Sequence, residues 1–283
     1  MTTELTLPTP LVSVAWLAAH LGEPQLVVLD AHMQPPSAPA SSGPVVQIPG
    51  ARRFDFDKQI CAPDTDLPHM LPTPERFSQQ VQALGLDNDS LIVVYDRIGL
   101  FSAPRAWWML RAMGHSRVAV LDGGLPAWLA AGHATEPERP YQGALGHFVA
   151  QLQPGLFCDA DTVAQELVSG RRPVLDARSE ARFKGLEAEP RAGLRAGHMP
   201  GAVNLPFGKL QQAGHMKPIP QLQAEFAPLL GEQQAPIFSC GSGVTACILA
   251  LGAELAGYQG LTVYDGSWSE WGSDPSRPVI NEA

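Results

Sequence analysis

Short apolar runs and helix-like stretches alternate along the chain, and the same order of segments occurs twice. Each apolar run ends at polar residues, which is typical of a buried strand that meets a loop. The runs of the first half lie within residues 26–33, 91–95 and 118–128, and their counterparts lie within 173–179, 236–239 and 261–271. Helix-like stretches at 103–113 and 245–256 separate the later runs. This alternation predicts an α/β fold in which each half forms a mostly parallel sheet flanked by helices.

The register between the two halves is nearly constant. Two Asp-Gly elements lie 143 residues apart, and Trp128 and Trp271 have the same separation. Gly99 and Gly243 are 144 residues apart. Several matches in the same order indicate two tandem copies of one domain.

The segment between the two copies is rich in turn-forming residues, as expected of a linker. We therefore predict a first domain over residues 1–140, a linker over 141–156 and a second domain over 157–283. We expect Arg105 and Arg111, which belong to the first copy, to bridge the two domains.

The overall charge argues against a polyanion as the main partner. The 19 Lys and Arg residues against 28 Asp and Glu give a net charge of −9, whereas nucleic acids and anionic membranes bind basic faces. No stretch is apolar enough to span a membrane, and the first residues lack a signal-peptide pattern. The 4 scattered cysteines fit neither a disulfide framework nor a zinc motif. We therefore expect a cytoplasmic monomer with free thiols, no metal and no cofactor.

The two copies differ in the loop between a strand and the following helix. The second copy has Cys240 followed by Gly241, Ser242 and Gly243, whereas the first has Asp96 at the matching position. In open parallel sheets, ligands bind beyond the carboxyl ends of the strands. A thiol placed there, just before a helix N-terminus, meets unpaired backbone amides that favour the reactive thiolate. The loop therefore predicts a nucleophilic cysteine.

Two interpretations of Cys240 compete at this point. A free cysteine is often a buried core residue, and the Gly-Ser-Gly sequence is then only a turn. A structural thiol, however, would more often be matched by a small apolar residue in the other copy, and Asp96 is a poor match. The difference favours a reactive thiol that one copy retains and the other lacks.

Several segments carry a resemblance to a known family, namely residues 69–72, 101–111, 197–202 and 240–246, with Arg182, Phe183, Pro190 and Arg191. Together they resemble the rhodanese-like sulfurtransferases, specifically the tandem-domain 3-mercaptopyruvate sulfurtransferases. The resemblance implies two rhodanese domains with the active site at their interface and a catalytic cysteine only in the C-terminal copy. Family members that prefer thiosulfate carry basic residues after the cysteine, where this chain has Gly241 and Ser242.

The resemblance also implies an activity. Cys240 would attack the sulfur of 3-mercaptopyruvate, retain it as a persulfide and release pyruvate. The sulfur would then pass to a thiol acceptor such as reduced thioredoxin, or to cyanide. Two half-reactions of this kind imply ping-pong kinetics.

Two arginines match those that bind the substrate in this family. Arg182 and Arg191 would bind the carboxylate and ketone of 3-mercaptopyruvate, for which the planar guanidinium is suited. Alternatively, both are surface residues paired with Glu187 and Glu189, which lie between them in the sequence.

Three further residues match a proton relay proposed for the family, namely Ser242, His69 and Asp57. They lie on different domains, so the relay requires a closed interface; otherwise His69 and Asp57 are ordinary loop residues. The loop residues expected to bind substrate or sulfur are Gly241, Gly243, Val244 and Thr245.

Other functions remain open on the sequence alone. A cysteine-based phosphatase needs an arginine six residues after the cysteine, where this chain has Ala246. A thiosulfate sulfurtransferase is the nearest alternative. A non-catalytic rhodanese-fold module that binds partners or senses oxidants is a more distant one.

Overall fold

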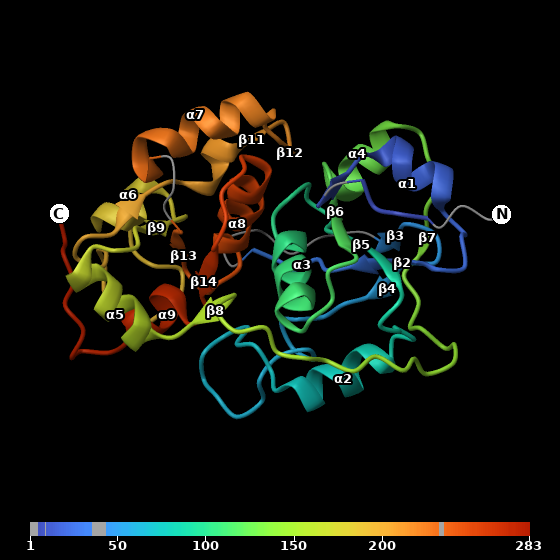
Figure 1. Ribbon diagram of the computed structural model, residues 1–283, viewed down its shortest axis with the longest axis horizontal. Helices are drawn as coiled ribbons and strands as arrows, with labels where there is room; N and C mark the ends of the chain where they lie inside the picture. Colours follow the sequence, from blue (N-terminus) through green and yellow to red (C-terminus); the bar gives the residue numbers. More distant parts are fainter. Residues whose placement is uncertain (1–4, 9, 36–43, 232–234) are drawn as a thin grey trace.

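Two α/β domains lie side by side in the computed structural model, which describes residues 5–8, 10–35, 44–231 and 235–283 (Figure 1). The strands of the first domain's main sheet are β1 (Leu11–Val12), β2 (Leu26–Asp30), β4 (Arg52–Arg53), β5 (Leu91–Tyr95) and β6 (Val118–Leu121). Its helices are α1 (Val14–His20), α2 (Pro74–Gln82), α3 (Ala103–Ala112) and α4 (Gly124–Ala130).

The second domain repeats this arrangement. The strands of its main sheet are β8 (Phe157–Cys158), β9 (Val174–Asp176), β10 (Val203–Asn204), β13 (Ile237–Ser239) and β14 (Thr262–Tyr264). Its helices are α5 (Ala160–Ser169), α6 (Glu180–Lys184), α7 (Ile219–Leu230), α8 (Ala246–Leu255) and α9 (Ser267–Trp271), with a 3-10 turn η1 (Phe207–Leu210).

The two main sheets have the same topology. The strand order is β1-β6-β5-β2-β4 in the first and, in the same direction, β8-β14-β13-β9-β10 in the second. All neighbouring strands in both sheets are parallel. The predicted α/β class, with two copies of a parallel sheet flanked by helices, is confirmed.

Each sheet is covered on both faces, which explains the continuous apolar runs in the sequence. In β2, Val27 and Leu29 face the cluster that contains α2 and α3, whereas Val28 faces the cluster formed with α1 and α4. Neighbouring residues of a strand point to opposite faces, so both sets are buried.

Two short antiparallel pairs lie outside the main sheets. β3 (Val46–Gln47) pairs with β7 (Glu136–Pro137), and β11 (Gln211–Gln212) pairs with β12 (His215–Met216). The β3–β7 pair attaches the start of the turn-rich segment to the first domain. Because this pair lies within the first domain and β8 begins at Phe157, we propose 140 and 157 as the domain limits.

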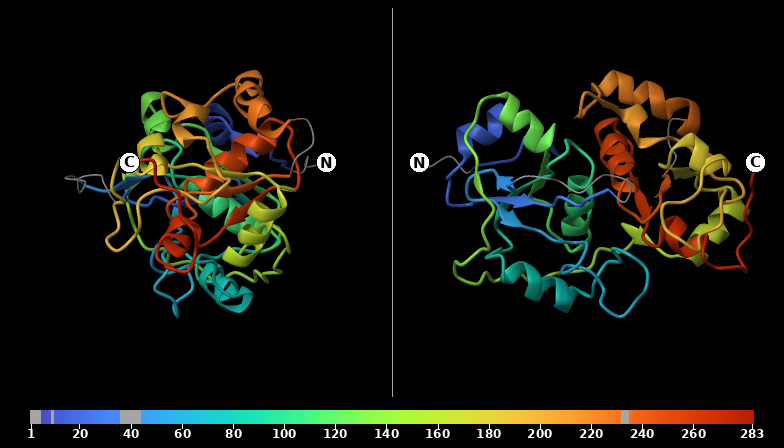
Figure 2. Two further views of the ribbon diagram at one scale, coloured as in Figure 1. Left: turned by 90° about the vertical axis from the view of Figure 1, so that its left-hand side faces the viewer. Right: turned by 180° about the vertical axis from the view of Figure 1, so that it is seen from behind.

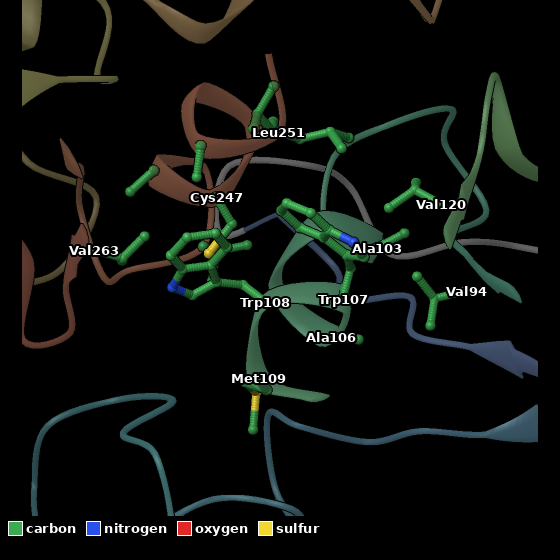
Figure 3. Packing of buried hydrophobic residues seen from close by; sticks show 14 of the residues in the cluster. Val94, Ala103, Ala106, Trp107, Trp108, Met109, Val120, Cys247, Leu251 and Val263 are labelled. Carbon is green, nitrogen blue, oxygen red and sulfur yellow. The ribbon is translucent and has the colours of Figure 1, made fainter. Parts of the chain in front are cut away.

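The two domains share one apolar core. Figures 1 and 2 show α3 of the first domain beside α8 of the second. Trp107 and Trp108 on α3 are almost completely buried and belong to the same cluster as Cys247 and Leu251 on α8 (Figure 3). A helix packed between its own sheet and another domain must be apolar on nearly all sides, as both helices are. The contact between α3 and α8 fixes the relative position of the loops that precede these two helices.

Among the described residues, no helix is long and apolar enough to cross a membrane.

Candidate active site

Cys240 lies at the carboxyl end of β13, in the loop that leads into α8, and is 1% exposed. Gly243 gives this loop its tight curve with a φ of +73°, and a Cβ there would lie 2.7 Å from the carbonyl oxygen of Asp265. Among the described residues, no hydrogen-bond acceptor meets the backbone amides of residues 241–246. We call these N–H groups of the cysteine loop the amide ring.

The matching loop of the first domain shows what such a ring binds. The Asp96 carboxylate is completely buried and accepts hydrogen bonds from four backbone amides. The donors are Ile98 (3.0 Å), Phe101 (2.7 Å), Ser102 (2.9 Å) and Ala103 (3.0 Å). The first copy thus fills its ring with its own anion, whereas the second has a thiol at this position and an open ring. The open ring is suited to an anion on or next to the sulfur.

Asp57 and His69, two of the three residues that match the family's relay, lie beside each other near this loop. His69 Nδ1 lies 3.0 Å from Asp57 Oδ1, although the angle falls short of good hydrogen-bond geometry. Contact with the His69 ring lowers the pKa of Asp57. Burial lowers the pKa of His69, and the Asp57 carboxylate opposes that effect. His69 is therefore a predominantly neutral imidazole near neutral pH.

Arg191 reaches the same histidine from the second domain. Its Nη2 lies 3.2 Å from His69 Nε2. Burial lowers the pKa of Arg191, and the nearby Cys240 and Asp57 act in the opposite direction. Arg191, His69 and Asp57 thus form a row of contacts beside the cysteine loop.

Arg182 lies against the other side of the loop. A Cβ on Gly241 would be 3.1 Å from Arg182 Nη2, so the missing side chain leaves room for the guanidinium. Arg182 also pairs with Glu189, at 2.5 Å from Nη2 to Oε2. One ion pair of the alternative interpretation, that of Arg182 with Glu189, therefore exists, and its carboxylate is buried. The side chain of Glu189 is only 2% exposed and also pairs with Arg178 at 2.7 Å.

The remaining predicted residues, Ser242, Val244 and Thr245, lie in the cysteine loop and differ in their contacts. Ser242 is nearly buried, but within the described chain no hydrogen bond joins its hydroxyl to His69. Of the three residues expected to form a relay, the structure brings only His69 and Asp57 into contact. Val244 is buried and its carbonyl accepts the amide of Cys247 at 3.1 Å, while Thr245 precedes α8 as its N-cap.

Two polar residues at the site had no predicted role. Asp265 is 7% exposed and pairs with Arg105 at 2.7 Å, which confirms that Arg105 bridges the domains. Asp265 belongs to the Asp-Gly element that is repeated at 122 and 265. The repeat does not indicate its ion pair with Arg105. Ser267 accepts the amide of Cys240 at 3.1 Å, and no sequence signal indicates this bond.

The fold and the loop define the class of protein, a tandem α/β protein in which the cysteine loop of the second copy meets the first domain. Comparison with known proteins agrees. The model of the rhodanese-like domain matches residues 13–131 and 159–274. The chain therefore belongs to the rhodanese family, in its two-domain form.

Similar proteins carry sulfurtransferase names. The chain is 41% identical to "Thiosulfate/3-mercaptopyruvate sulfurtransferase 1, mitochondrial" of Arabidopsis thaliana, over 98% of this chain and 80% of the relative. It is 38% identical to the 3-mercaptopyruvate sulfurtransferase of Escherichia coli (strain K12), over 95% and 96% of the two chains. Among solved structures, the 3-mercaptopyruvate sulfotransferase SseA of Escherichia coli matches with a TM-score of 0.82 and 36% identity, over 92% of this chain and 99% of that one.

Proposed function

We propose that this protein is a 3-mercaptopyruvate sulfurtransferase. The observation that carries the proposal is the open amide ring around Cys240, with Arg182 and Arg191 beside it. A ring of donors suits the anion of a persulfide. Two guanidinium groups suit a small substrate that carries a carboxylate and a ketone. The names of the relatives support the same substrate.

In the first half-reaction, the Cys240 thiolate attacks the sulfur of 3-mercaptopyruvate. The carbon–sulfur bond breaks, and its electron pair remains on the pyruvate enolate. Protonation of the enolate gives pyruvate, and the outer sulfur stays on Cys240 as a persulfide. We assign the binding of the carboxylate and ketone to Arg182 and Arg191. The amides of Gly241, Gly243, Val244 and Thr245 hold the sulfur anion.

In the second half-reaction, a thiolate of the acceptor attacks the outer sulfur. The sulfur–sulfur bond breaks, and its electrons return to Cys240 as thiolate. We assign proton transfer in the two steps to Ser242, His69 and Asp57. The ring of His69 already lies beside Asp57, so the assignment requires that Arg191 release His69 Nε2 and that Ser242 reach this nitrogen directly or through a water molecule.

Intact-mass spectrometry tests the proposal directly. Incubation with 3-mercaptopyruvate under non-reducing conditions should add one sulfur atom, about 32 Da, to Cys240. Cyanide should remove this mass, whereas an oxidised cysteine of equal mass would keep it. Cys240→Ser should show neither the adduct nor turnover, with Cys247→Ser as the matched control. A wild-type protein that never gains the adduct would refute the mechanism.

Thiosulfate is a second candidate substrate, because the Arabidopsis relative carries both substrates in its name. The ratio of kcat/KM for the two donors decides between them, and we expect 3-mercaptopyruvate to be preferred. The third alternative is a non-catalytic module that binds partners or senses oxidants. Such a module would keep its function in Cys240→Ser, whereas a sulfurtransferase would lose sulfur transfer.

We also propose a thiol acceptor such as thioredoxin, a monomer and a cytoplasmic location. All four cysteines are free in the structure, which fits a reducing compartment. Sulfide release with reduced thioredoxin, light scattering of the purified protein and cell fractionation test the three proposals separately.

A further inference from the structure

Arg105 is a completely buried arginine whose side chain crosses from the first domain into the active site of the second. It lies on α3 and donates to three oxygen atoms from three different segments. Its Nη2 lies 2.7 Å from Asp265 Oδ1 and 2.5 Å from the carbonyl oxygen of His69. Its Nη1 lies 3.2 Å from the carbonyl oxygen of Gly243.

Two of these oxygens are the carbonyl oxygens of His69 and Gly243, whose backbone conformations shape the site. His69 has a φ of +63°, a left-handed conformation that is costly for a residue with a side chain. Its carbonyl group faces Arg105, so the guanidinium stabilises this conformation. Gly243 is the residue that curves the amide ring around Cys240. One planar group therefore sets the position of the histidine relative to the cysteine loop.

Asp265 completes the arrangement from the second domain. Its Oδ1 binds Arg105, and its Oδ2 accepts the backbone amide of Leu71 at 2.8 Å. Leu71 lies two residues after His69 in the same loop. The carboxylate thus holds the loop of the first domain at a second point.

Packing alone does not require a charge at this position. Desolvating a buried ion pair is costly, and apolar residues of similar volume are often as stable or more so. α3 already contacts α8 through apolar side chains such as Trp108. A buried arginine here therefore calls for a role beyond joining the domains.

We infer that Arg105 is a positioning residue that aligns His69 with the amide ring around Cys240 when the two domains are closed. The inference rests on the proposed function for its kinetic consequence, but the alignment itself is measurable without catalysis. Arg105 acts through the backbone of His69 and Gly243.

The same helix offers a matched control. Arg111 also lies on α3 and also pairs with a carboxylate of the second domain, that of Glu254. Its guanidinium lies over the ring of Trp107, 4.7 Å from its centroid. No bond between the described residues joins Arg111 to His69 or to the cysteine loop. Arg111→Lys therefore weakens the bridge between domains without affecting the alignment.

The test compares Arg105→Lys with Arg111→Lys. A lysine keeps the charge beside Asp265 but cannot reach both carbonyl oxygens in fixed geometry. We expect the single-turnover rate of persulfide formation to fall about 10–100-fold in Arg105→Lys. Arg111→Lys should keep the wild-type rate. The Kd of pyruvate, the probe for Arg182 and Arg191, should change by less than about twofold in both variants.

Hydrogen exchange provides the readout that is independent of activity. Arg105→Lys should speed exchange in the peptides that contain the amides of Leu71 and Cys247, whereas Arg111→Lys should not. A folded Arg105→Lys protein with wild-type exchange in both peptides would overturn the inference, whether or not the protein transfers sulfur. Faster exchange in both peptides of Arg105→Lys, combined with a wild-type rate of persulfide formation, would also overturn the inference.

A second variant covers the case in which Arg105→Lys does not fold. Asp265→Asn keeps the shape of the side chain but removes the charge that holds Arg105. It should also slow persulfide formation and speed exchange at Leu71. A folded Asp265→Asn protein with wild-type values of both would contradict the inference. Failure of the wild-type protein to form a persulfide would instead contradict the proposed function.

Discussion

Arg191 of the second domain donates to Nε2 of His69 in the first, at 3.2 Å. An arginine has no acceptor atom, so Nε2 carries a lone pair and the proton of the neutral ring lies on Nδ1, facing Asp57. Before Nε2 can accept a proton, Arg191 must turn away from it. A carboxylate that binds Arg191 therefore also frees the histidine.

The first prediction concerns the pKa of His69. Burial lowers this pKa, Asp57 raises it, and the positive charges of Arg105 and Arg191 lower it further. Removing a neighbouring cation makes protonation easier, so Arg191→Met should raise the pKa. Pyruvate should raise it in the wild-type protein by engaging Arg191. NMR titration of the His69 ring measures both effects.

Arg182→Met is the control for this titration, because Arg105 and Arg191 are the cations that lower the pKa of His69 most. We expect the pKa of His69 to be the same in this variant as in the wild-type protein without ligand. A pKa that stays unchanged in Arg191→Met would show that the contact has no influence on the histidine.

The second prediction concerns the missing side chain at Gly241. In Gly241→Ala, the new Cβ would lie 3.1 Å from Arg182 Nη2, so the guanidinium must shift by a few tenths of an ångström. Since the end of an arginine moves easily, the free energy of unfolding should change by less than about 0.5 kcal/mol. The KM for 3-mercaptopyruvate should rise about three- to tenfold, because the shifted arginine binds the carboxylate less well.

Gly208→Ala is the matched control, since a Cβ at Gly208 would meet no atom within 4 Å. Steady-state kinetics should show a wild-type KM for that variant. Equal KM values for Gly241→Ala and wild type would exclude Arg182 from substrate binding at its present position.

The third prediction separates two roles of Glu189. This carboxylate binds Arg178 at 2.7 Å and Arg182 at 2.5 Å, and both oxygens are engaged. It holds one edge of the Arg182 guanidinium and leaves the other donors for a ligand. Because Glu189 orients Arg182 in this way, we expect Glu189→Gln to raise the KM about tenfold with a smaller change in kcat.

The opposite result is equally informative. A lower KM in Glu189→Gln would contradict this prediction and would show that Glu189 competes with the substrate for Arg182. Steady-state kinetics of Glu189→Gln beside Glu187→Gln decides, because Glu187 is exposed and lies in the same loop. We expect the exposed variant to behave as the wild type.

The sequence predicted the site in part, and the reason lies in what a repeat preserves. The constant register placed Cys240 opposite Asp96 at the ends of equivalent strands, and the structure has both there. The contacts across the interface leave no periodic pattern, because they depend on how α3 docks against α8. For this reason the convergence of Arg105 on His69 and Gly243 could be found only in the structure, although Arg105 was expected to bridge the domains.

The last prediction tests the amide ring through the copy that lacks the cysteine. Asp96→Asn replaces a buried carboxylate that accepts four backbone amides, and the new amide group would direct its own N–H toward some of them. Hydrogen bonds to a charged group contribute about 1.5–3 kcal/mol each, so the free energy of unfolding should fall by at least about 1.5 kcal/mol. Urea denaturation measures this loss, with the exposed Asp89→Asn as the surface control. Sulfur transfer by the folded Asp96→Asn protein should be unchanged, since Asp96 lies outside the cysteine loop. If the substitution costs no more than the control, the ring does not favour an anion, and the same ring around Cys240 then provides no stabilisation for a persulfide.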